Sequence, residues 1–239
     1  NTEVRFKITM TDGTWSDVYS FILIVNVDYI NIAINDVAST ITSKGLIGYN
    51  ASGQLGGLGF TYMGGATILY EMGLMIGATG TQVSDCVRGD GSGYDEDFAS
   101  VLAVSSQEPG VYSDFDAYGK FRDNGLTSVS PISVFVTHRA YAWMAPADRK
   151  YIIVEYTIKN TSGGNLSNLF AGLFADWDIP AYANNKCSVD NSRNMGYAWS
   201  TDVAGLYAGM KLLSPGAFNS YAIDNISGGN GGLDMFDGY

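Results

Sequence analysis

The segment YIIVEYTIKNTSGGNLSNLFAGLF, residues 151–174, decides the fold class because its apolar residues follow the two-residue period of a β-strand. In the first half, one face of an extended strand would carry the apolar side chains Ile152, Val154, Tyr156 and Ile158. Tyr151 and Ile153 on the opposite face predict that this side is partly covered as well. The polar turn of residues 160–165 follows, and residues 166–174 are expected to run back as a second strand.

The same alternation recurs along the chain, with Gly or Asn between short strands. Residues 66–80 are apolar enough for a helix, but the glycines at positions 73, 77 and 80 favour two strands or a bend. Closely spaced strands without helices between them predict an all-β fold, a large antiparallel β-sandwich. The absence of a regular sequence repeat argues against a propeller or a solenoid. The clearest further strands are expected at residues 133–143, 168–178, 195–200 and 204–213.

The first 28 residues form a separate unit of this pattern. Residues 3–10 and 18–27 alternate, and the Gly-containing turn between them predicts a β-hairpin. This hairpin resembles the last two strands of an immunoglobulin-like or fibronectin-like segment, and alone it would be incomplete. We therefore divide the chain into residues 1–28, from such a segment, and an accessory β-sandwich domain at residues 29–239. Because the alternation starts almost at the first residue, we expect the chain to be a piece of a longer protein.

The composition limits the compartment and the partners of the chain. Of its 239 residues 46% are hydrophobic and only 15% are charged, and 30 glycines and 16 tyrosines are typical of β-sheets with tight turns. The formal net charge of −11 disfavours binding to nucleic acid, because the phosphate backbone is itself an anion. No apolar run approaches the roughly 18 residues of a membrane span, so we expect no membrane insertion. The composition favours a protein that is secreted or held at the cell surface.

Catalytic side chains are scarce in the sequence. His138 is the only histidine, and its register with Val134 and Val136 places it on a sheet face beside Arg139, whose charge would disfavour protonation of the ring. A structural role is therefore expected for this histidine. No serine lies in a Gly-x-Ser-x-Gly elbow, and the glycine-rich segments lack the Lys-Ser/Thr of a phosphate-binding loop. We predict that this chain has no catalytic residue and is not itself an enzyme.

The two cysteines allow two interpretations. Cys86 and Cys187 lie far apart in the sequence and neither has a neighbouring histidine, which argues against a zinc site. In an oxidising compartment they would form one disulfide, and otherwise they would be two separate, partly buried thiols.

An acidic and glycine-rich stretch, DCVRGDGSGYDEDF at residues 85–98, is the candidate metal site. Calcium prefers several oxygen ligands, and the carboxylates and carbonyls of such a loop supply them. Counted from Asp85, Glu96 has the position of the last ligand of an EF-hand loop, but Val87 and Gly89 replace intermediate ligands, so that motif is absent. A solvated polar loop is the alternative interpretation. The predicted calcium ligands are Asp90, Asp95 and Asp97.

A second acidic stretch, GLFADWDIPAY at residues 172–182, places two carboxylates after an apolar run. Asp176 and Asp178 would share one face of an extended strand with Cα atoms about 6–7 Å apart. That geometry does not place one acid on each side of a glycosidic bond, so catalysis is the weakest of three interpretations. We expect the acids to end the strand and to bind the downstream loop through its Asn residues, Lys186 and Arg193, and cation binding is the other alternative.

Carbohydrate binding is the main alternative to a purely structural role for these aromatic and acidic residues. Exposed rings stack on sugars and carboxylates accept hydrogen bonds from sugar hydroxyls, whereas core packing is the competing explanation for each ring. The candidate stacking rings are Trp143, Tyr182, Tyr197 and Trp199. The candidate ligand-binding set is Asp176, Asp178, Trp143 and Trp199.

Whole phrases of the chain resemble a known family. The segments DYINIAINDVASTITSKGLIGYN, GFTYMGGATILYEMGLMIG, VSDCVR and VEYTIKNTSG…LFAGLFADWDI are similar to the region downstream of the catalytic domain in secreted subtilisin-like serine peptidases of the Bacteroidetes type. The resemblance covers the chain from about Ser20 to Ser200. The Asp, His and Ser motifs of the subtilisin active site are absent, so no catalytic residue is carried over.

The resemblance implies a secreted parent protein with a protease domain upstream of this chain. The chain would then be a non-catalytic accessory β domain that positions the enzyme or engages its substrate. Its partners would be other domains of the parent chain and a protein or glycan substrate. A carbohydrate-binding module and a cell-surface adhesion domain are the alternatives.

Overall fold

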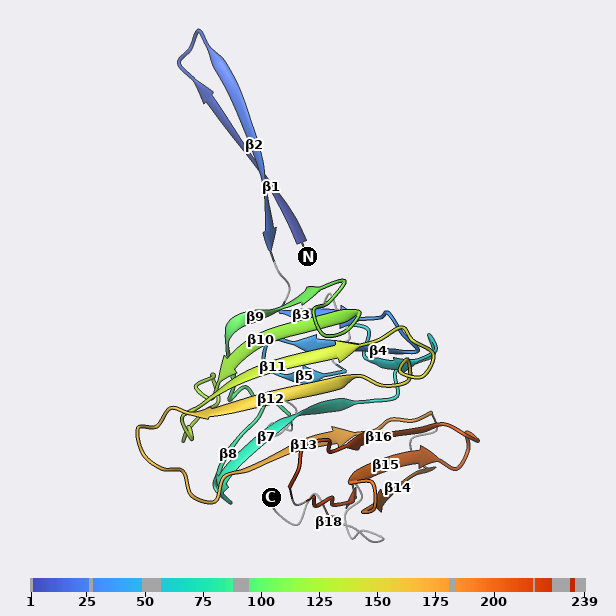
Figure 1. The fold of residues 1–239 in the computed structure, drawn as a ribbon. Helices are drawn as coiled ribbons and strands as arrows, with labels where there is room; N and C mark the ends of the chain where they lie inside the picture. Colours follow the sequence, from blue (N-terminus) through green and yellow to red (C-terminus); the bar gives the residue numbers. More distant parts are fainter. Residues whose placement is uncertain are drawn as a thin grey trace.

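The computed structural model describes residues 2–25, 28–48, 57–87, 95–180, 184–216, 218–224 and 233–234. These residues form strands β1 to β18 and no helix, and almost every strand pair is antiparallel. Two of the sheets face each other as a β-sandwich, a third sheet lies beside them, and a hairpin projects from the body (Figure 1). The predicted all-β antiparallel fold is confirmed.

The first sheet of the sandwich has the strand order β12-β11-β10-β9. Side chains alternate strictly between buried and partly exposed along β10 and β11, so each strand has one inner and one outer face. Inward-facing residues of β12 include Val154, Tyr156 and Ile158, which pack on the core as the sequence predicts. The strands are β9 (Ala99–Gln107), β10 (Phe115–Arg122), β11 (Val134–Ala142) and β12 (Ile153–Asn160).

The second sheet has the order β13-β7-β5-β4-β3, and β6 and β8 pair with β4 and β7. Residues 66–80 were expected to form two strands or a bend, and they contain an isolated bridge at Thr67, a bend at Tyr70 and one strand, β7, which begins at Glu71 and turns near Gly80 into β8. The strands are β3 (Tyr29–Ile32), β4 (Val37–Thr42), β5 (Leu46–Ile47), β6 (Phe60–Tyr62), β7 (Glu71–Thr79), β8 (Gln82–Ser84) and β13 (Phe170–Asp176).

The expected return of residues 166–174 onto the preceding strand is wrong. β13 pairs with β7 in the second sheet, whereas β12 belongs to the first sheet. The connection of residues 161–169 is longer than a tight hairpin loop, which lets the chain cross from one sheet to the other. The alternation of apolar residues is the same for both topologies, so it could not distinguish them.

The core lies between the two sheets and draws on both. Leu74 and Ile76 of β7 pack with Phe121, Val134 and Val136 of the first sheet in one cluster. A second cluster joins β3 and β4 to β9, β10 and β11 through Ile32, Ile41, Val104, Phe115, Ala117, Ala140 and Ala142. One polar contact also links the layers, because the Val104 N–H donates to the buried Ser43 hydroxyl at 2.8 Å.

The third sheet, β14-β15-β16, covers the far end of the second sheet. Ala198 of β15 faces inward and packs with Ile68 and Ile179. Trp177 joins this contact, with its ring edge-on to that of Phe60 at a centroid distance of 5.5 Å. The strands are β14 (Asn185–Asp190), β15 (Met195–Ser200) and β16 (Tyr207–Lys211), and a short parallel pair, β17 (Ile223–Asp224) and β18 (Leu233–Asp234), follows.

The N-terminal hairpin, β1 (Thr2–Thr11) and β2 (Ser16–Val25), has the predicted connection. The Asp12 carboxylate fixes its turn by accepting hydrogen bonds from the N–H groups of Thr14 at 2.9 Å and Trp15 at 2.7 Å. Gly13 has a φ of 95°, a left-handed conformation that glycine adopts without steric cost. Among the described residues, β1 and β2 pair only with each other.

His138 lies in the core, in register with Val134 and Val136 as expected. Its side chain is 2% exposed, its ring packs edge-on to Phe121 at 5.3 Å, and its Nε2 has no hydrogen-bond partner. Gly119 lies opposite His138 in the β10–β11 pair, and a Cβ atom at this position would collide with the imidazole ring. Burial lowers the pKa of His138 from 6.5 to about 4. Arg139 is not the cause, because it alternates to the outer face of the sheet.

The buried His138 predicts a specific sensitivity to acid. The folded protein binds the proton more weakly than the unfolded chain, so stability that is present above pH 6.5 is lost as the pH falls towards 4. The pKa difference corresponds to about 3 kcal/mol of unfolding free energy. His138→Leu removes the titrating group without breaking a bond to Nε2. Urea unfolding measures the free energy of unfolding at neutral pH and near pH 4. The decrease between the two pH values should be smaller for the variant than for the wild type, and equal decreases would contradict the prediction.

Candidate functional site

The acidic loop forms a compact cluster of carboxylates. Asp85, Asp95 and Asp97 each bring a carboxylate oxygen within 4.8 Å of the others, and Asp85 and Asp97 are buried. The structure therefore brings together two of the three predicted calcium ligands. Asp90 lies outside the described residues. Asp85 completes the described cluster, and the sequence had placed it in the acidic stretch without naming it as a ligand.

Backbone and side-chain hydrogen bonds hold this cluster in place. Asp97 accepts from the Asp85 N–H at 3.3 Å and from the Thr127 hydroxyl at 2.9 Å, one bond to each carboxylate oxygen. Asp85 accepts from the Val87 N–H at 2.8 Å. The loop between β10 and β11 packs closely here, because a Cβ atom on Gly125 would collide with the carbonyl oxygens of Glu96 and Asp97. Three separate segments thus position the acids.

The electrostatics of the cluster favour an added positive charge. Burial, together with the charges of Asp95, Asp97 and Glu71 and against the hydrogen bond from the Val87 N–H, raises the pKa of Asp85 from 3.8 to about 7. A cleft of about 380 Å³, lined by residues that include Thr127, Ser128 and Ser130, opens beside Asp95 and Asp97. Carboxylate and hydroxyl oxygens are the ligands of calcium. Asp85, Asp95 and Asp97 could hold such a cation, or Asp85 could retain a proton.

The second pair of acids ends a strand, as the sequence suggests. Asp176 is the last residue of β13, and the Asp178 N–H beyond it donates to the Ile68 carbonyl at 3.0 Å. Burial, followed by the charge of Asp176, raises the pKa of Asp178. The downstream loop is bound here through the backbone, because the Asn185 side chain donates to the Trp177 carbonyl at 2.9 Å. Arg193 was an expected donor to these acids. Its Nη1 instead lies 3.4 Å from Oδ2 of Asp190, with which it forms an ion pair.

The predicted ligand-binding rings belong to different sheets. Trp143 follows β11 in the first sheet and packs between Tyr141 and Tyr151 at centroid distances of 6.3 and 6.1 Å. Trp199 lies in β15 of the third sheet. The structure therefore does not bring Asp176, Asp178, Trp143 and Trp199 into one site. Tyr182 lies outside the described residues.

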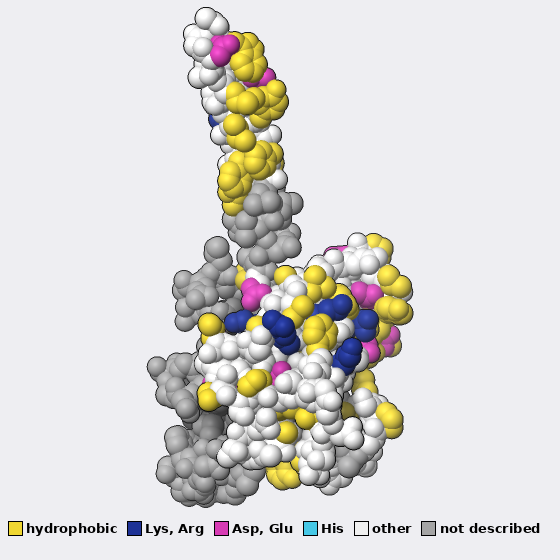
Figure 2. Space-filling model, turned by 90° about the vertical axis from the view of Figure 1, so that its left-hand side faces the viewer, with side chains coloured by type: hydrophobic (Ala, Val, Ile, Leu, Met, Phe, Trp, Pro, Cys, Tyr) yellow, Lys and Arg dark blue, Asp and Glu magenta, His cyan; other side chains and the backbone are white. Residues whose placement is uncertain are grey.

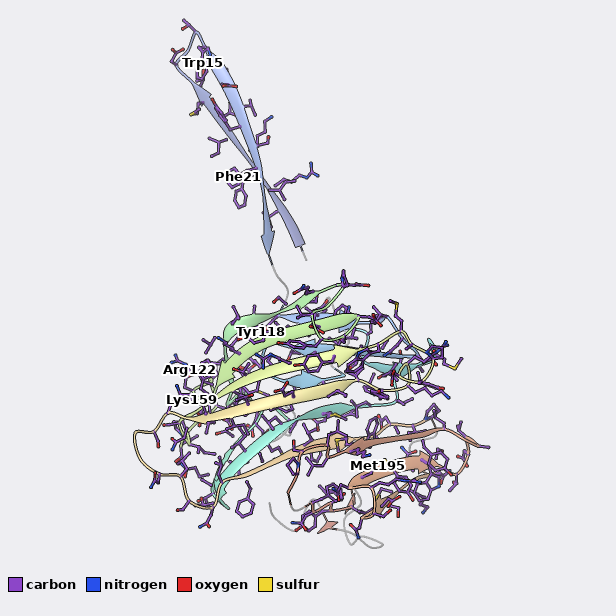
Figure 3. The ribbon with its side chains drawn as sticks, in the orientation of Figure 1. Trp15, Phe21, Tyr118, Arg122, Lys159 and Met195 are labelled. Carbon is purple, nitrogen blue, oxygen red and sulfur yellow. The ribbon has the colours of Figure 1, made fainter. Side chains whose placement is uncertain are left out.

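The outer face of the third sheet carries a row of aromatic rings. Trp199 lies 5.6 Å from the Tyr197 ring in a stacked arrangement and 6.0 Å from that of Tyr207. The sequence missed Tyr207, which comes from the next strand and joins the row through the pairing of Trp199 with Tyr207. A cleft of about 330 Å³ lies beside the rings, and its lining includes Asp190 and Met195, the latter labelled in Figure 3.

The cysteines do not form a disulfide with each other. Cys86 lies in the core, where burial raises the pKa of its thiol to about 12, and Cys187 is exposed on β14. Of the two interpretations from the sequence, the structure agrees with two separate thiols.

Comparison with models of protein families, with curated proteins and with solved structures finds no match to this chain. The described part of the chain contains no helix that is long and apolar enough to span a membrane.

Replacement of Asp85 by Asn tests the charge of the acid cluster. Because folding raises the pKa of Asp85, unfavourable charge develops in the folded protein as the pH rises from about 4 to about 7 and is complete above that range. Asn retains an acceptor for the Val87 N–H, so Asp85→Asn should be more stable than wild type at pH 8, by up to about 4 kcal/mol. Urea unfolding without divalent cations measures this difference in unfolding free energy between the variant and the wild type, and the difference should vanish near pH 4.

Calcium adds a second measurement to the same pair of proteins. Millimolar calcium should raise the Tm of the wild type at pH 8 and leave that of Asp85→Asn unchanged. Asp202→Asn, at an exposed position far from the cluster in sequence, is the control and should behave as wild type. A wild-type Tm that neither calcium nor chelator changes would contradict calcium binding.

Proposed function

We propose that the chain is a non-catalytic accessory β domain of a secreted multidomain protein of the subtilisin-like serine peptidase type, in which it positions the enzyme or engages its substrate. The hairpin β1–β2 is the observation that carries this proposal. An element that is apolar on one face and uncovered in the chain itself is suited to packing against another domain.

The apolar face of the hairpin is continuous. Residues directly opposite in the register share a face, which pairs Phe6 with Phe21 and Ile8 with Tyr19. The Phe6 and Phe21 rings stack at 5.1 Å. Figure 2 shows hydrophobic side chains along one side of the hairpin, and Figure 3 shows Phe21 projecting from the strands. We call this surface the hairpin face, and its described side chains, each between 36% and 53% exposed, are Val4, Phe6, Ile8, Met10, Tyr19 and Phe21.

The size of the hairpin face argues against a second copy of the chain as its cover. Two paired strands of 10 residues are about 33 Å long and about 10 Å wide, a footprint of about 330 Å². Two such faces packed together have a combined footprint of about 700 Å², small beside the roughly 1,200 Å² of accessible surface that a stable interface buries. A partner that covers more of the hairpin than this one face fits better.

The edges of the hairpin indicate what that partner is. Among the described residues, β1 and β2 have no other strand neighbour, so the outer edge of each offers backbone N–H and C=O groups to further strands. A partner that extends the sheet and also lays a second sheet on the hairpin face satisfies both requirements. The remaining strands of an immunoglobulin-like or fibronectin-like domain in the same polypeptide have these properties.

Two further observations support a non-catalytic role in a peptidase of this type. A Ser-His-Asp mechanism needs an imidazole that reaches the reacting atoms, and His138, the only histidine, is 2% exposed in the core. The connection to subtilisin-like peptidases comes from the phrases of sequence described above, which begin after the hairpin and lie in the sandwich.

The same substitution in two lengths of polypeptide tests the proposal. In the 239-residue chain, Phe6→Ser/Phe21→Ser should leave the Tm of the sandwich unchanged, because the hairpin contributes nothing to the described core clusters. In the longer natural polypeptide, the two changes should destabilise the neighbouring domain by about 3 kcal/mol or more, because each removes a buried aromatic ring.

Thr9→Ser and Ser20→Thr, on the opposite hairpin face, provide a matched control that should have no effect in either polypeptide. A double variant that is neutral in the longer polypeptide would contradict a covered hairpin face. A lower Tm in the 239-residue chain would show that the hairpin packs on the sandwich instead.

A further inference from the structure

The outer face of the first sheet is basic, although the chain as a whole is acidic. It carries four of the 13 Lys and Arg residues and two acids, Asp116 and Glu155, in a chain with a net charge of −11. Lys and Arg side chains gather on one side of the sandwich body in Figure 2, and Arg122 and Lys159 lie at the same end of their strands in Figure 3. We call this surface the basic face and define it by Tyr118, Lys120, Arg122, Phe135, Arg139 and Lys159.

Strand register orders these side chains into rows. Phe135 of β11 is opposite Arg122 of β10 on one side and Lys159 of β12 on the other. In this row, an aromatic ring therefore lies between two cationic side chains. Neighbouring strands are about 4.8 Å apart, which places the two cations on either side of the ring within about 10 Å. A row of Lys120 and two threonine hydroxyls, Thr137 and Thr157, lies beside it.

Most of the positive charge on this face is not compensated within the protein. Arg139 lies 4.0 Å from Glu155 and 5.2 Å from the Tyr118 ring centroid, and Lys120 lies 5.5 Å from the same ring. Lys120, Arg122 and Lys159 make no ion pair with any residue that the structure describes. Three cations therefore face solvent beside two aromatic rings.

We propose that the basic face binds an anionic polysaccharide through its carboxylate or sulfate groups. Arg122 and Lys159 pair with successive anionic groups, the Phe135 ring stacks on a sugar ring between them, and the hydroxyls of Thr137 and Thr157 bond sugar hydroxyls. The assignment is independent of the role of the hairpin, which lies on a different part of the chain.

The shape and charge of the basic face favour a glycan over the other polyanions. Peptides that add to a sheet bind at its edge, whereas Arg122 and Phe135 lie on β10 and β11, the two interior strands of this sheet. Nucleic acid carries a denser charge, and the net charge of −11 repels it at the distances over which a long duplex approaches. A polysaccharide with one charge per sugar matches cations that alternate with a ring.

Binding to defined polymers tests the proposal on the 239-residue chain. Affinity electrophoresis and calorimetry should show binding to polygalacturonate or chondroitin sulfate at low salt, a weaker affinity as salt rises, and no binding to neutral dextran. Arg122→Ala/Lys159→Ala should weaken the affinity at least about tenfold, since two charge-assisted contacts are lost. Phe135→Leu, which keeps the charge, should also weaken it. An unchanged Tm for each variant shows that the fold is intact.

The controls separate this face from the rest of the surface. Lys186→Ala/Lys211→Ala makes the same charge change on the third sheet, where Lys186 is opposite Trp199 and Lys211 is opposite Met195, and should leave the affinity within about twofold. An equal loss in this control, or a loss with Trp199→Ala instead, would overturn the assignment. So would tighter binding to polyglutamate or to single-stranded DNA than to either polysaccharide, or the absence of binding to both polysaccharides at low salt.

Discussion

Apolar faces of β-sheets must be covered, and this requirement determines how the chain is organised. The two main sheets cover each other through Phe121, Val134 and Val136 on one side and Leu74 and Ile76 on the other. The third sheet covers the far end of the second sheet, and Trp177 and the residues around Ile179 pack in the contact between them. The hairpin has a continuous apolar face that none of the other described elements covers. The proposed place of the chain in a larger protein follows from that difference.

Polar side chains at the ends of the strands are largely structural, and their placement explains why they gave an ambiguous signal in the sequence. Asp123 is buried and accepts hydrogen bonds from the N–H groups of Ser133 and Val134, so it fixes the loop between β10 and β11. Asp12 does the same for the hairpin turn. The acid cluster at Asp85 differs, because it places buried carboxylates beside one another and beside a cleft. Burial and the neighbouring charges raise the pKa of Asp85 in this cluster.

The sequence predicted the strands and their inner faces because side-chain alternation is a local property. β11 lies within the expected residues 133–143, and β12 begins two residues after the expected start, with Val154, Tyr156 and Ile158 packed on the core as the alternation indicates. It did not predict that β13 pairs with β7, because alternation specifies a face and not a neighbour. The basic face was missed for the same reason. Arg122, Phe135 and Lys159 lie on three strands and meet only through the register.

The central claim is that the sandwich is covered by its own sheets whereas the hairpin depends on a neighbour. Hydrogen exchange of the backbone amides in the 239-residue chain measures this for each strand. The account predicts that β10 and β11 exchange only through global unfolding, while β1 and β2 exchange with little protection. Hairpin amides as strongly protected as those of β10 in this chain alone would contradict it.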